Sequence, residues 1–323
     1  MAPTYLVTGG AGFIGSHIVE ALVRQGATVR VLDDFSTGHR RNLDSVSRDV
    51  EILEGSICNP ELVQRAMRGV ECVFHQAALA SVPLSVERPL ETHAVCVTGT
   101  LNILDAARRM GVRRVIYASS SAVYGDQPTA AKRETDLPQP VSPYGAAKLA
   151  GEYYCQAAYR TYRLETVGLR YFNVFGPRQD PASPYAAVIP KFVSAMLQGQ
   201  RPTIFGDGRQ SRDFTYVQNV VEANLLAANC SAAAGYVLNI ANGRSYDLLT
   251  LVHMLNELLG TNIEPCFEAP RPGDIRDSMA DITLARSVLG YEPRVELRDG
   301  LAKTIAYYAQ VTAYPLTHSN SVR

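Results

Sequence analysis

The amino-acid sequence predicts an α/β fold, a doubly wound parallel sheet with a smaller, interleaved C-terminal lobe. Three observations lead to this prediction. Short apolar runs alternate with amphipathic helical patterns, a glycine-rich turn follows the first run, and the alternation breaks after about residue 174. Strands that are apolar on both sides are typical of a parallel sheet covered by helices on both faces.

The predicted strands are short and rich in β-branched residues. They lie at 4–10, 28–34, 50–55, 72–78, 113–120 and 166–173. Between the strands at 72–78 and 113–120, the stretch 99–111 has helical spacing, with Leu101, Leu104 and Ala107 on one face and Gly111 at its end. The tail after about residue 311 has little pattern, and we expect it to fray.

A second lobe is predicted where loops rich in proline and glycine follow residue 174. The run 236–243 has the character of one more strand, which we expect to return to the sheet. The larger domain is therefore predicted to comprise 1–174 plus about 213–243, and the smaller lobe about 175–212 plus 244–310.

Composition excludes several classes of protein. The 31 Lys and Arg balance 31 Asp and Glu, so no basic field favours nucleic acid or an anionic membrane. No apolar run approaches a membrane span, and the N-terminus lacks the basic region of a signal peptide. The 6 cysteines are widely spaced without a C-x-x-C, as is typical of reduced thiols in a cytoplasmic protein with no metal site.

The glycine-rich turn carries the first functional signal. It contains Gly10-x-Gly12-x-x-Gly15 and also the wider spacing that begins at Gly9. Such glycines let backbone N–H groups approach a pyrophosphate at a helix N-terminus. The next strand ends in Asp33 and Asp34, where a carboxylate can bind an adenosine ribose and repel a 2′-phosphate. A plain turn with solvated aspartates would look similar, but the strand–turn–helix context predicts a Rossmann domain that binds NAD.

The second signal is a tyrosine and a lysine one helical turn apart. Tyr144 and Lys148 follow Ser142 and Pro143, a plausible N-cap and first helical residue. Residues i and i+4 share a helix face, so the ammonium is expected to stabilise the phenolate, lower its pKa and make Tyr144 a proton acceptor. Alone, such a pair is more often an ordinary surface pair.

Serines at the end of the 113–120 strand complete the set. The run "ASSSAVYG" puts Ser120 and Ser121 at the carboxyl end of a parallel strand, where active sites of open sheets lie. The competing interpretation is a polar loop.

Together these motifs resemble the extended short-chain dehydrogenase/reductase superfamily, and within it the nucleotide-sugar 4-epimerases that act on UDP-glucose and UDP-N-acetylglucosamine. The resemblance extends from "TGGAGFIG" through "HQAALASVP", "SPYGAAK", "RYFNVFGPRQ", "IFGDGRQSRDFTYV" and "RPGD" to "LGYEP". It implies tightly bound NAD, a transient 4-keto sugar, Tyr144 as the proton acceptor, Lys148 at the nicotinamide ribose and Ser120 as the catalytic hydroxyl.

The resemblance also implies two sets of binding residues. Those for the cofactor are Gly9, Gly12, Phe13, Ile14, Gly15, Asp33, Asp34, Ser36, Thr37, Gly38, Ser56, Ile57, Gln76, Ala77, Ala78, Ala80, Cys96, Tyr144, Lys148 and Tyr171. Those for the UDP-sugar are Ser81, Ser120, Ser121, Tyr144, Asn173, Val188, Ile189, Phe192, Thr203, Phe205, Arg212, Arg271, Asp274 and Ser278. Arginine suits bidentate phosphate contact.

Three positions depart from the family pattern. Ser56 stands for an aspartate near the adenine, Cys96 for an asparagine, and Asn219 for an aspartate. These departures put local cofactor contacts in question and leave the chemistry untouched.

Other activities of the family stay open. A dehydratase commonly has Asp-Glu after the catalytic hydroxyl, where this chain has Ser121 and Ala122. A UDP-glucuronate 4-epimerase or decarboxylase remains an alternative. A non-catalytic NAD-sensing regulator typically loses the tyrosine or lysine, and both are present here.

The resemblance carries two further expectations. Ser278 matches a position near the sugar C2 substituent that is a tyrosine in enzymes restricted to UDP-glucose and UDP-galactose, and a serine leaves room for an acetamido group. The helices at about 92–110 and 144–165 resemble those that pair in family homodimers, with Ala147, Leu149, Tyr153, Tyr154 and Ala157 on the second helix.

Overall fold

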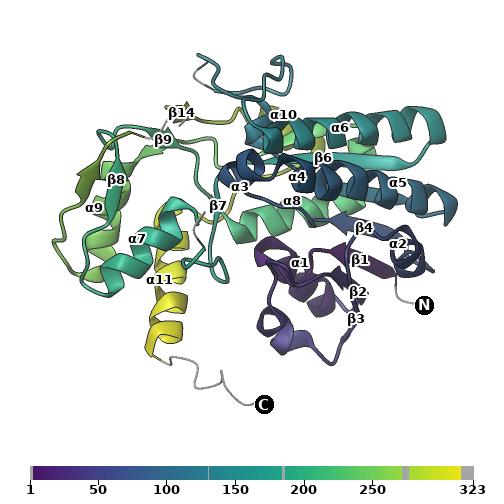
Figure 1. Cartoon of the computed structure of the whole chain (residues 1–323), viewed down its shortest axis with the longest axis horizontal. Coiled ribbons are helices and arrows are strands. Elements are labelled where there is room, and N and C mark those ends of the chain that lie inside the picture. Colours follow the sequence, from purple (N-terminus) through teal and green to yellow (C-terminus); the bar gives the residue numbers. More distant parts are fainter. Residues whose placement is uncertain (1–2, 130, 184–185, 271–275, 314–323) are drawn as a thin grey trace.

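The computed structural model describes residues 3–129, 131–183, 186–270 and 276–313, which form two lobes (Figure 1). The larger lobe occupies the right of the view and contains the N-terminal half of the chain. The smaller lobe, on the left, is built from segments that come after residue 174.

A seven-stranded sheet forms the centre of the larger lobe. Its strands are β1 (Thr4–Thr8), β2 (Thr28–Asp33), β3 (Val50–Glu54), β4 (Cys72–His75), β5 (Arg114–Ser120), β6 (Glu165–Tyr171) and β11 (Val237–Ile240). They pair in parallel in the order β11-β6-β5-β4-β1-β2-β3. The predicted doubly wound parallel sheet is confirmed, including the late strand that returns to its edge.

Helices cover both faces of this sheet. On one side lie α2 (Pro60–Ala66), α3 (Val82–Glu87), α4 (Pro89–His93), the π-helix η2 (Ala94–Gly99), α5 (Thr100–Arg109) and α6 (Pro143–Tyr162). On the other side lie α1 (Phe13–Arg24), α8 (Val217–Asn229) and α10 (Thr283–Leu289). A separate cluster of buried apolar side chains fills the space on each side. Burial on both faces explains why the strands are apolar throughout.

The smaller lobe has its own core. Its elements are α7 (Val188–Leu197), β8 (Thr203–Phe205), α9 (Leu248–Leu259), β13 (Cys266–Glu268) and α11 (Leu297–Ala313). The side chains of Phe192, Ile204, Leu251 and Leu301 are buried together there. Strand β13 pairs in parallel with β8, although about sixty residues separate them.

Short strands lie where the chain passes between the lobes. They are β7 (Val174–Phe175), β9 (Ser211–Arg212), β10 (Thr215–Tyr216), β12 (Tyr246–Asp247) and β14 (Asp277–Ser278). Three 3-10 helices, η1 (Arg40–Val46), η3 (Ser121–Val123) and η4 (Ser231–Ala233), belong to the larger lobe. Strand β10 pairs with β7, and β9 lies between β12 and β14. The chain therefore passes between the lobes several times.

One element differs from the predicted division. Helix α10 falls within 244–310, which the sequence suggested for the smaller lobe, yet it packs against β11 and α8. Its buried Ala285 and Leu289 belong to the same core as Ile240. Sequence order alone could not reveal this return, because the helix has an ordinary amphipathic pattern.

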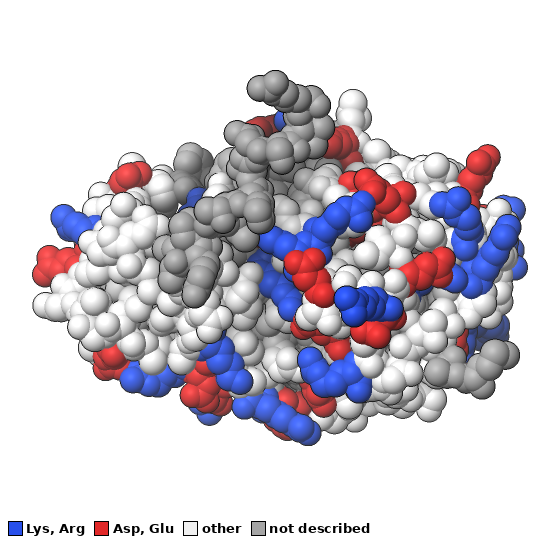
Figure 2. Space-filling model, turned by 90° about the horizontal axis from the view of Figure 1, so that it is seen from below, with Lys and Arg blue, Asp and Glu red and all other residues white. Residues whose placement is uncertain are grey.

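Charge is mixed on the face of the molecule that Figure 2 shows. Figure 2 shows acidic and basic side chains interspersed on one face rather than gathered by sign. Within the part of the chain that the structure describes, no helix combines the length and apolar character that crossing a membrane requires.

Candidate active site

The turn between β1 and α1 needs glycine at several positions. Gly9 has a φ of +66°, and Gly12 N–H donates to its carbonyl oxygen at 3.1 Å. A Cβ atom on Gly15 would lie only 2.0 Å from the Gly9 oxygen. The loop is thus held close to the first turn of α1, and its shape suits a pyrophosphate at the helix N-terminus.

Asp33 ends β2 beside this loop. Its Oδ2 accepts a hydrogen bond from Ala11 N–H at 2.8 Å, and its Oδ1 accepts one from Phe35 N–H at 2.8 Å. Burial raises the pKa of this carboxyl, while the two N–H donors oppose the shift. A carboxylate has about four acceptor sites. Asp33 can therefore also accept hydrogen bonds from ribose hydroxyls.

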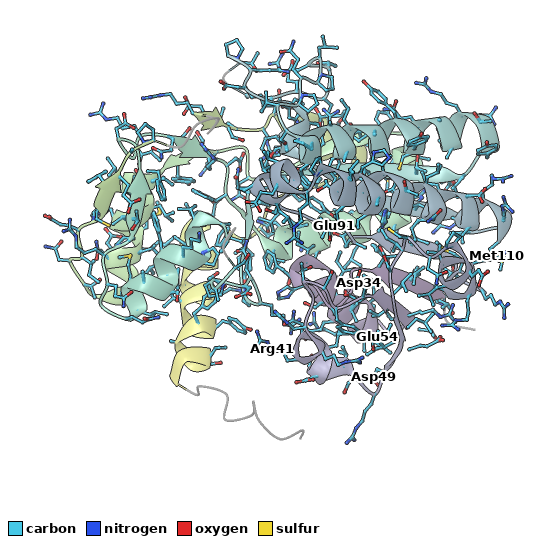
Figure 3. All side chains as sticks on the ribbon, in the orientation of Figure 1. Asp34, Arg41, Asp49, Glu54, Glu91 and Met110 are labelled. Carbon is cyan, nitrogen blue, oxygen red and sulfur yellow. The ribbon has the colours of Figure 1, made fainter. Side chains whose placement is uncertain are left out.

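Asp34 differs from its neighbour. It is exposed and is labelled in Figure 3. Its Oδ1 accepts hydrogen bonds from the Ser36 backbone N–H at 3.0 Å and the Ser36 hydroxyl at 2.6 Å. These bonds close a local turn, so Asp34 acts mainly on its own loop.

A pocket runs from the glycine loop to α6. The predicted cofactor residues that line it are Gly9, Gly12, Phe13, Ile14, Gly15, Asp33, Asp34, Ser36, Thr37, Gly38, Ile57, Gln76, Ala77, Ala78, Ala80, Tyr144, Lys148 and Tyr171. Ser56 and Cys96 are not among the lining residues. Cys96 is buried behind the pocket, and the Ser56 hydroxyl accepts a hydrogen bond from Cys58 N–H.

The pocket also contains residues that sequence reasoning missed. Arg178 and Asp180, which follow β7 in the sequence, line it together with His39 and Asn42. Arg178 donates to the Ser16 hydroxyl at 3.2 Å and pairs with Glu20 on α1. Arg178 lies within the motif "RYFNVFGPRQ", but the motif alone did not indicate that its side chain lines the cofactor pocket.

Helix α6 brings Tyr144 and Lys148 to the pocket. The Ser142 hydroxyl accepts a hydrogen bond from Gly145 N–H at 3.1 Å, and Pro143 begins the helix, as predicted. Lys148 is buried, and its ammonium donates to the Ala118 carbonyl oxygen at 2.7 Å. That bond fixes the lysine against the end of β5.

Burial acts against the expected lowering of the tyrosine pKa. Burial raises the pKa of Tyr144 well above that of a free phenol, and a hydrogen bond with Ser120 opposes the increase. The Lys148 ammonium lies 5.8 Å from the Tyr144 ring centroid and is directed at the Ala118 carbonyl. Burial therefore dominates the pKa of Tyr144 in this structure, and the role of Lys148 in making Tyr144 a proton acceptor stays a prediction.

The predicted serines lie at the carboxyl end of β5. Ser120 is the last residue of that strand, and its hydroxyl accepts a hydrogen bond from Ala122 N–H at 3.1 Å. Ser121 begins the single turn η3. Ser120 is therefore the serine that the structure brings to Tyr144.

A neutral histidine lies near Lys148, and the sequence analysis did not single it out. His75 is fully buried, with its ring nitrogens 2.8 Å from Thr8 Oγ1 and 3.0 Å from Thr100 Oγ1. Because Thr100 donates its own proton to the Cys96 carbonyl at 2.7 Å, it accepts from His75 Nε2–H. Burial lowers the pKa of His75 to about 3, and Lys148 adds to this. No second positive charge accumulates beside Lys148.

A second pocket lies between the lobes. The predicted substrate residues that line it are Asn173, Val188, Ile189, Thr203, Phe205 and Arg212. Phe192 is buried in the core behind them. Tyr171 lines the first pocket and Asn173 lines the second, so two residues close together at the carboxyl end of β6 each line one of the pockets.

The remaining predicted substrate residues have different positions. Ser278 on β14 pairs with Arg212 on β9. Ser81 caps α3, accepting from Leu84 N–H at 3.1 Å. Arg271 and Asp274 lie outside the described residues.

Asn219, the third departure, has a structural role. Its Nδ2 donates to the Val295 carbonyl at 2.9 Å, and its Oδ1 accepts from the N–H groups of Arg294 and Val295 at 3.1 and 3.0 Å. An aspartate could accept but not donate here. Within the described residues, no group of three or more His, Cys, Asp or Glu side chains could hold a metal ion.

Comparisons with known proteins agree with this geometry. Residues 5–241 match the model of the NAD dependent epimerase/dehydratase family. The chain is 40% identical over 308 residues to a UDP-glucose 4-epimerase of Mycolicibacterium smegmatis, covering 94% of this chain and 97% of that protein.

Two solved structures superpose closely. One is a UDP-glucose 4-epimerase of Thermotoga maritima with UDP-glucose (TM-score 0.91, 40% identity, 96% of this chain and 99% of that one). The other is a UDP-N-acetylglucosamine 4-epimerase of Methanobrevibacter ruminantium in complex with UDP-N-acetylmuramic acid (TM-score 0.92, 39% identity, 96% and 99%).

Proposed function

Because this chain belongs to the NAD-dependent epimerase/dehydratase family, we propose that it is a UDP-hexose 4-epimerase that accepts N-acetylated sugars as well as UDP-glucose and UDP-galactose. The family's dependence on NAD confirms the predicted cofactor. The observation that carries the proposal is that Tyr144 and Lys148 lie on the wall of the first pocket, while residues close together at the end of β6 line both this pocket and the second one.

Three side chains, those of Tyr144, Ser120 and Lys148, have roles in the proposed reaction. When bound, NAD supplies a reversible acceptor for the hydride of the sugar C4. In this proposal the Lys148 ammonium stabilises the Tyr144 phenolate against the cost of burial, and the phenolate accepts the proton of the sugar 4-hydroxyl and later returns it. Ser120, hydrogen-bonded to Tyr144, orients the phenol, and Lys148 holds a positive charge beside it.

The residues that line the second pocket support the proposed nucleotide site. Asn173 and Arg212 both line the second pocket. Arginine and amide side chains suit the phosphates of a nucleotide diphosphate. Ser278 pairs with Arg212, which puts a small side chain beside a proposed phosphate ligand. By the family resemblance, a small side chain at position 278 leaves room for an acetamido group.

We also propose that the protein forms a homodimer. Helices α4 and α5 each lie beside α6 (Figure 1). Val86, Leu90, Leu101, Tyr153 and Tyr154 are exposed on these helices or next to them, Leu90 to 85%. Leu101 was expected to share a face with the buried Leu104 and Ala107, but it is exposed. Exposed apolar side chains concentrated on neighbouring helices are typical of an interface.

A cytoplasmic location stays part of the proposal. It is supported by the thiols, since Cys58, Cys72, Cys96, Cys155, Cys230 and Cys266 are all free.

A substrate assay tests the proposed function. The purified protein is incubated separately with UDP-glucose, UDP-N-acetylglucosamine and UDP-glucuronate, and the products are separated by chromatography. We expect the 4-epimers of the first two and no reaction of the third. Turnover of UDP-glucuronate alone, with or without loss of carbon dioxide, would replace the proposal with the sugar-acid alternative.

A further inference from the structure

A buried carboxylate lies next to Arg212, one of the residues that line the second pocket. Asp213 joins β9 to β10 and is completely buried. Its Oδ1 accepts from Asn242 N–H at 2.9 Å, and its Oδ2 accepts from Gly243 N–H at 2.9 Å and from Ala280 N–H at 3.3 Å. One side chain therefore holds two chain segments that are far apart in the sequence.

The backbone of Asp213 makes further connections. Its N–H donates to the Ser278 carbonyl oxygen at 2.7 Å, and its carbonyl accepts from Asn173 Nδ2 at 3.2 Å. Arg212 precedes it directly and pairs with Ser278 across the small sheet. Three predicted substrate residues are thus tied to one position.

The surroundings of the carboxyl favour this use. Burial raises the pKa of Asp213 to about 6, and the backbone N–H donors oppose that rise. The nearby titratable group on a packed element is Tyr291, whose hydroxyl donates to the Ala241 carbonyl at 3.0 Å. The Arg244 side chain is directed outward to Glu296 at 3.8 Å. At pH 8 Asp213 is ionised, and both oxygens are free to accept hydrogen bonds.

We propose that Asp213 is a positioning residue for the UDP-sugar, which keeps Asn173, Arg212 and Ser278 in one arrangement by holding β14 and the 242–243 turn against β9. Naming the ligand as a UDP-sugar rests on the proposed function. The positioning itself rests on the hydrogen bonds described above. Asp213 touches no reacting atom, and its effect passes through the three residues that it fixes.

Asp213→Asn tests the proposal at pH 8. Asparagine has nearly the same shape, but its Nδ2 cannot accept from a backbone N–H. We expect the Kd for UDP-glucose, measured by calorimetry, and the KM to rise about ten-fold or more, with kcat changed less than about three-fold. The amount of bound NAD should not change, because the first pocket contains no contact with Asp213.

Asp247→Asn is the matched control. Asp247 lies on β12, the other neighbour of β9, and its Oδ1 caps α9 by accepting from Thr250 N–H at 2.7 Å. Asparagine is as good an N-cap as aspartate, so this variant should keep the wild-type Kd.

Amide hydrogen exchange provides a measurement that does not depend on the variant folding. In the wild-type protein the amides of Asn242, Gly243 and Ala280 should be protected, and UDP-glucose should increase their protection. If those amides exchange at open-chain rates, or if folded Asp213→Asn binds UDP-glucose like the wild type, the positioning role is wrong. A wild type that protects these amides and contains NAD but binds no UDP-sugar would instead contradict the proposed function.

Discussion

Arg170 and Glu152 form a buried ion pair between β6 and α6. Arg170 donates to the carboxylate from Nε at 2.9 Å and from Nη2 at 2.7 Å, and both side chains are almost completely buried. The Ser119 hydroxyl also hydrogen-bonds to Glu152. Glu152 lies one helical turn after Lys148, so this pair holds the face of α6 that carries Lys148 against the ends of β5 and β6.

Removing the carboxylate should destabilise the fold. Glu152→Ala leaves the Arg170 charge buried, where Nη1 already has no hydrogen-bond partner. Breaking a buried pair in this way costs about 3–5 kcal/mol of the free energy of unfolding. Urea denaturation measures it. Glu91→Ala is the control, because Glu91, labelled in Figure 3, pairs with Arg88 on the surface and should contribute little. Equal stabilities of the two variants would contradict the prediction.

Tyr144→Phe should remove the proton acceptor while keeping the ring in place. We expect the epimerisation rate to fall at least about 10²-fold, the low end for general acid–base catalysis, with the thermal unfolding midpoint nearly unchanged. Tyr162→Phe, on the exposed end of the same helix, serves as the control. Near-normal turnover by folded Tyr144→Phe would rule out this role.

The two aspartates at the end of β2, Asp33 and Asp34, should differ in how much they contribute to NAD binding. The wild-type protein, denatured after purification, should release NAD. Asp33→Asn should reduce the amount of NAD retained, because Asp33 is buried in the pocket and also orders the glycine loop through Ala11 N–H. Asp34→Asn changes an exposed local turn and should retain NAD. Chromatography of the released nucleotide decides between them, and NADP in the wild type would contradict the assignment.

Ser278→Tyr should narrow the range of sugars. A tyrosine ring beside Arg212 would fill the space proposed for an acetamido group, so turnover of UDP-N-acetylglucosamine should be lost while that of UDP-glucose remains. Ser278→Ala keeps the space and should keep both activities. A wild type that converts UDP-glucose but neither N-acetylated sugar would show that Ser278 does not decide the range.

The dimer should depend on the exposed apolar side chains near α6. Leu90→Glu puts a charge into the proposed interface, and we expect light scattering to change from the mass of two chains to that of one. Leu137→Glu introduces the same charge at a leucine that is 72% exposed in the loop after Gly125, and it should leave the dimer intact. A wild type that is monomeric at micromolar concentration would refute the proposal.

The sequence by itself determined the sheet, the glycine loop and the start of α6. These features depend on neighbours within a few residues: apolar runs make buried strands, Gly9 needs a positive φ, and Ser142 caps the helix that Pro143 begins. Family resemblance added the residue roles, which the structure leaves as predictions.

Only the tertiary structure decided how the site behaves. The pKa of Tyr144 rises because the fold buries the phenol, a quantity that spacing along a helix does not contain. Asp213 and Glu152 acquire their roles from groups that are distant in sequence, Ala280 in one case and Arg170 in the other. Burial and long-range hydrogen bonds arise only when the chain is folded, so the sequence could name the reacting residues but not the residues that hold them in position.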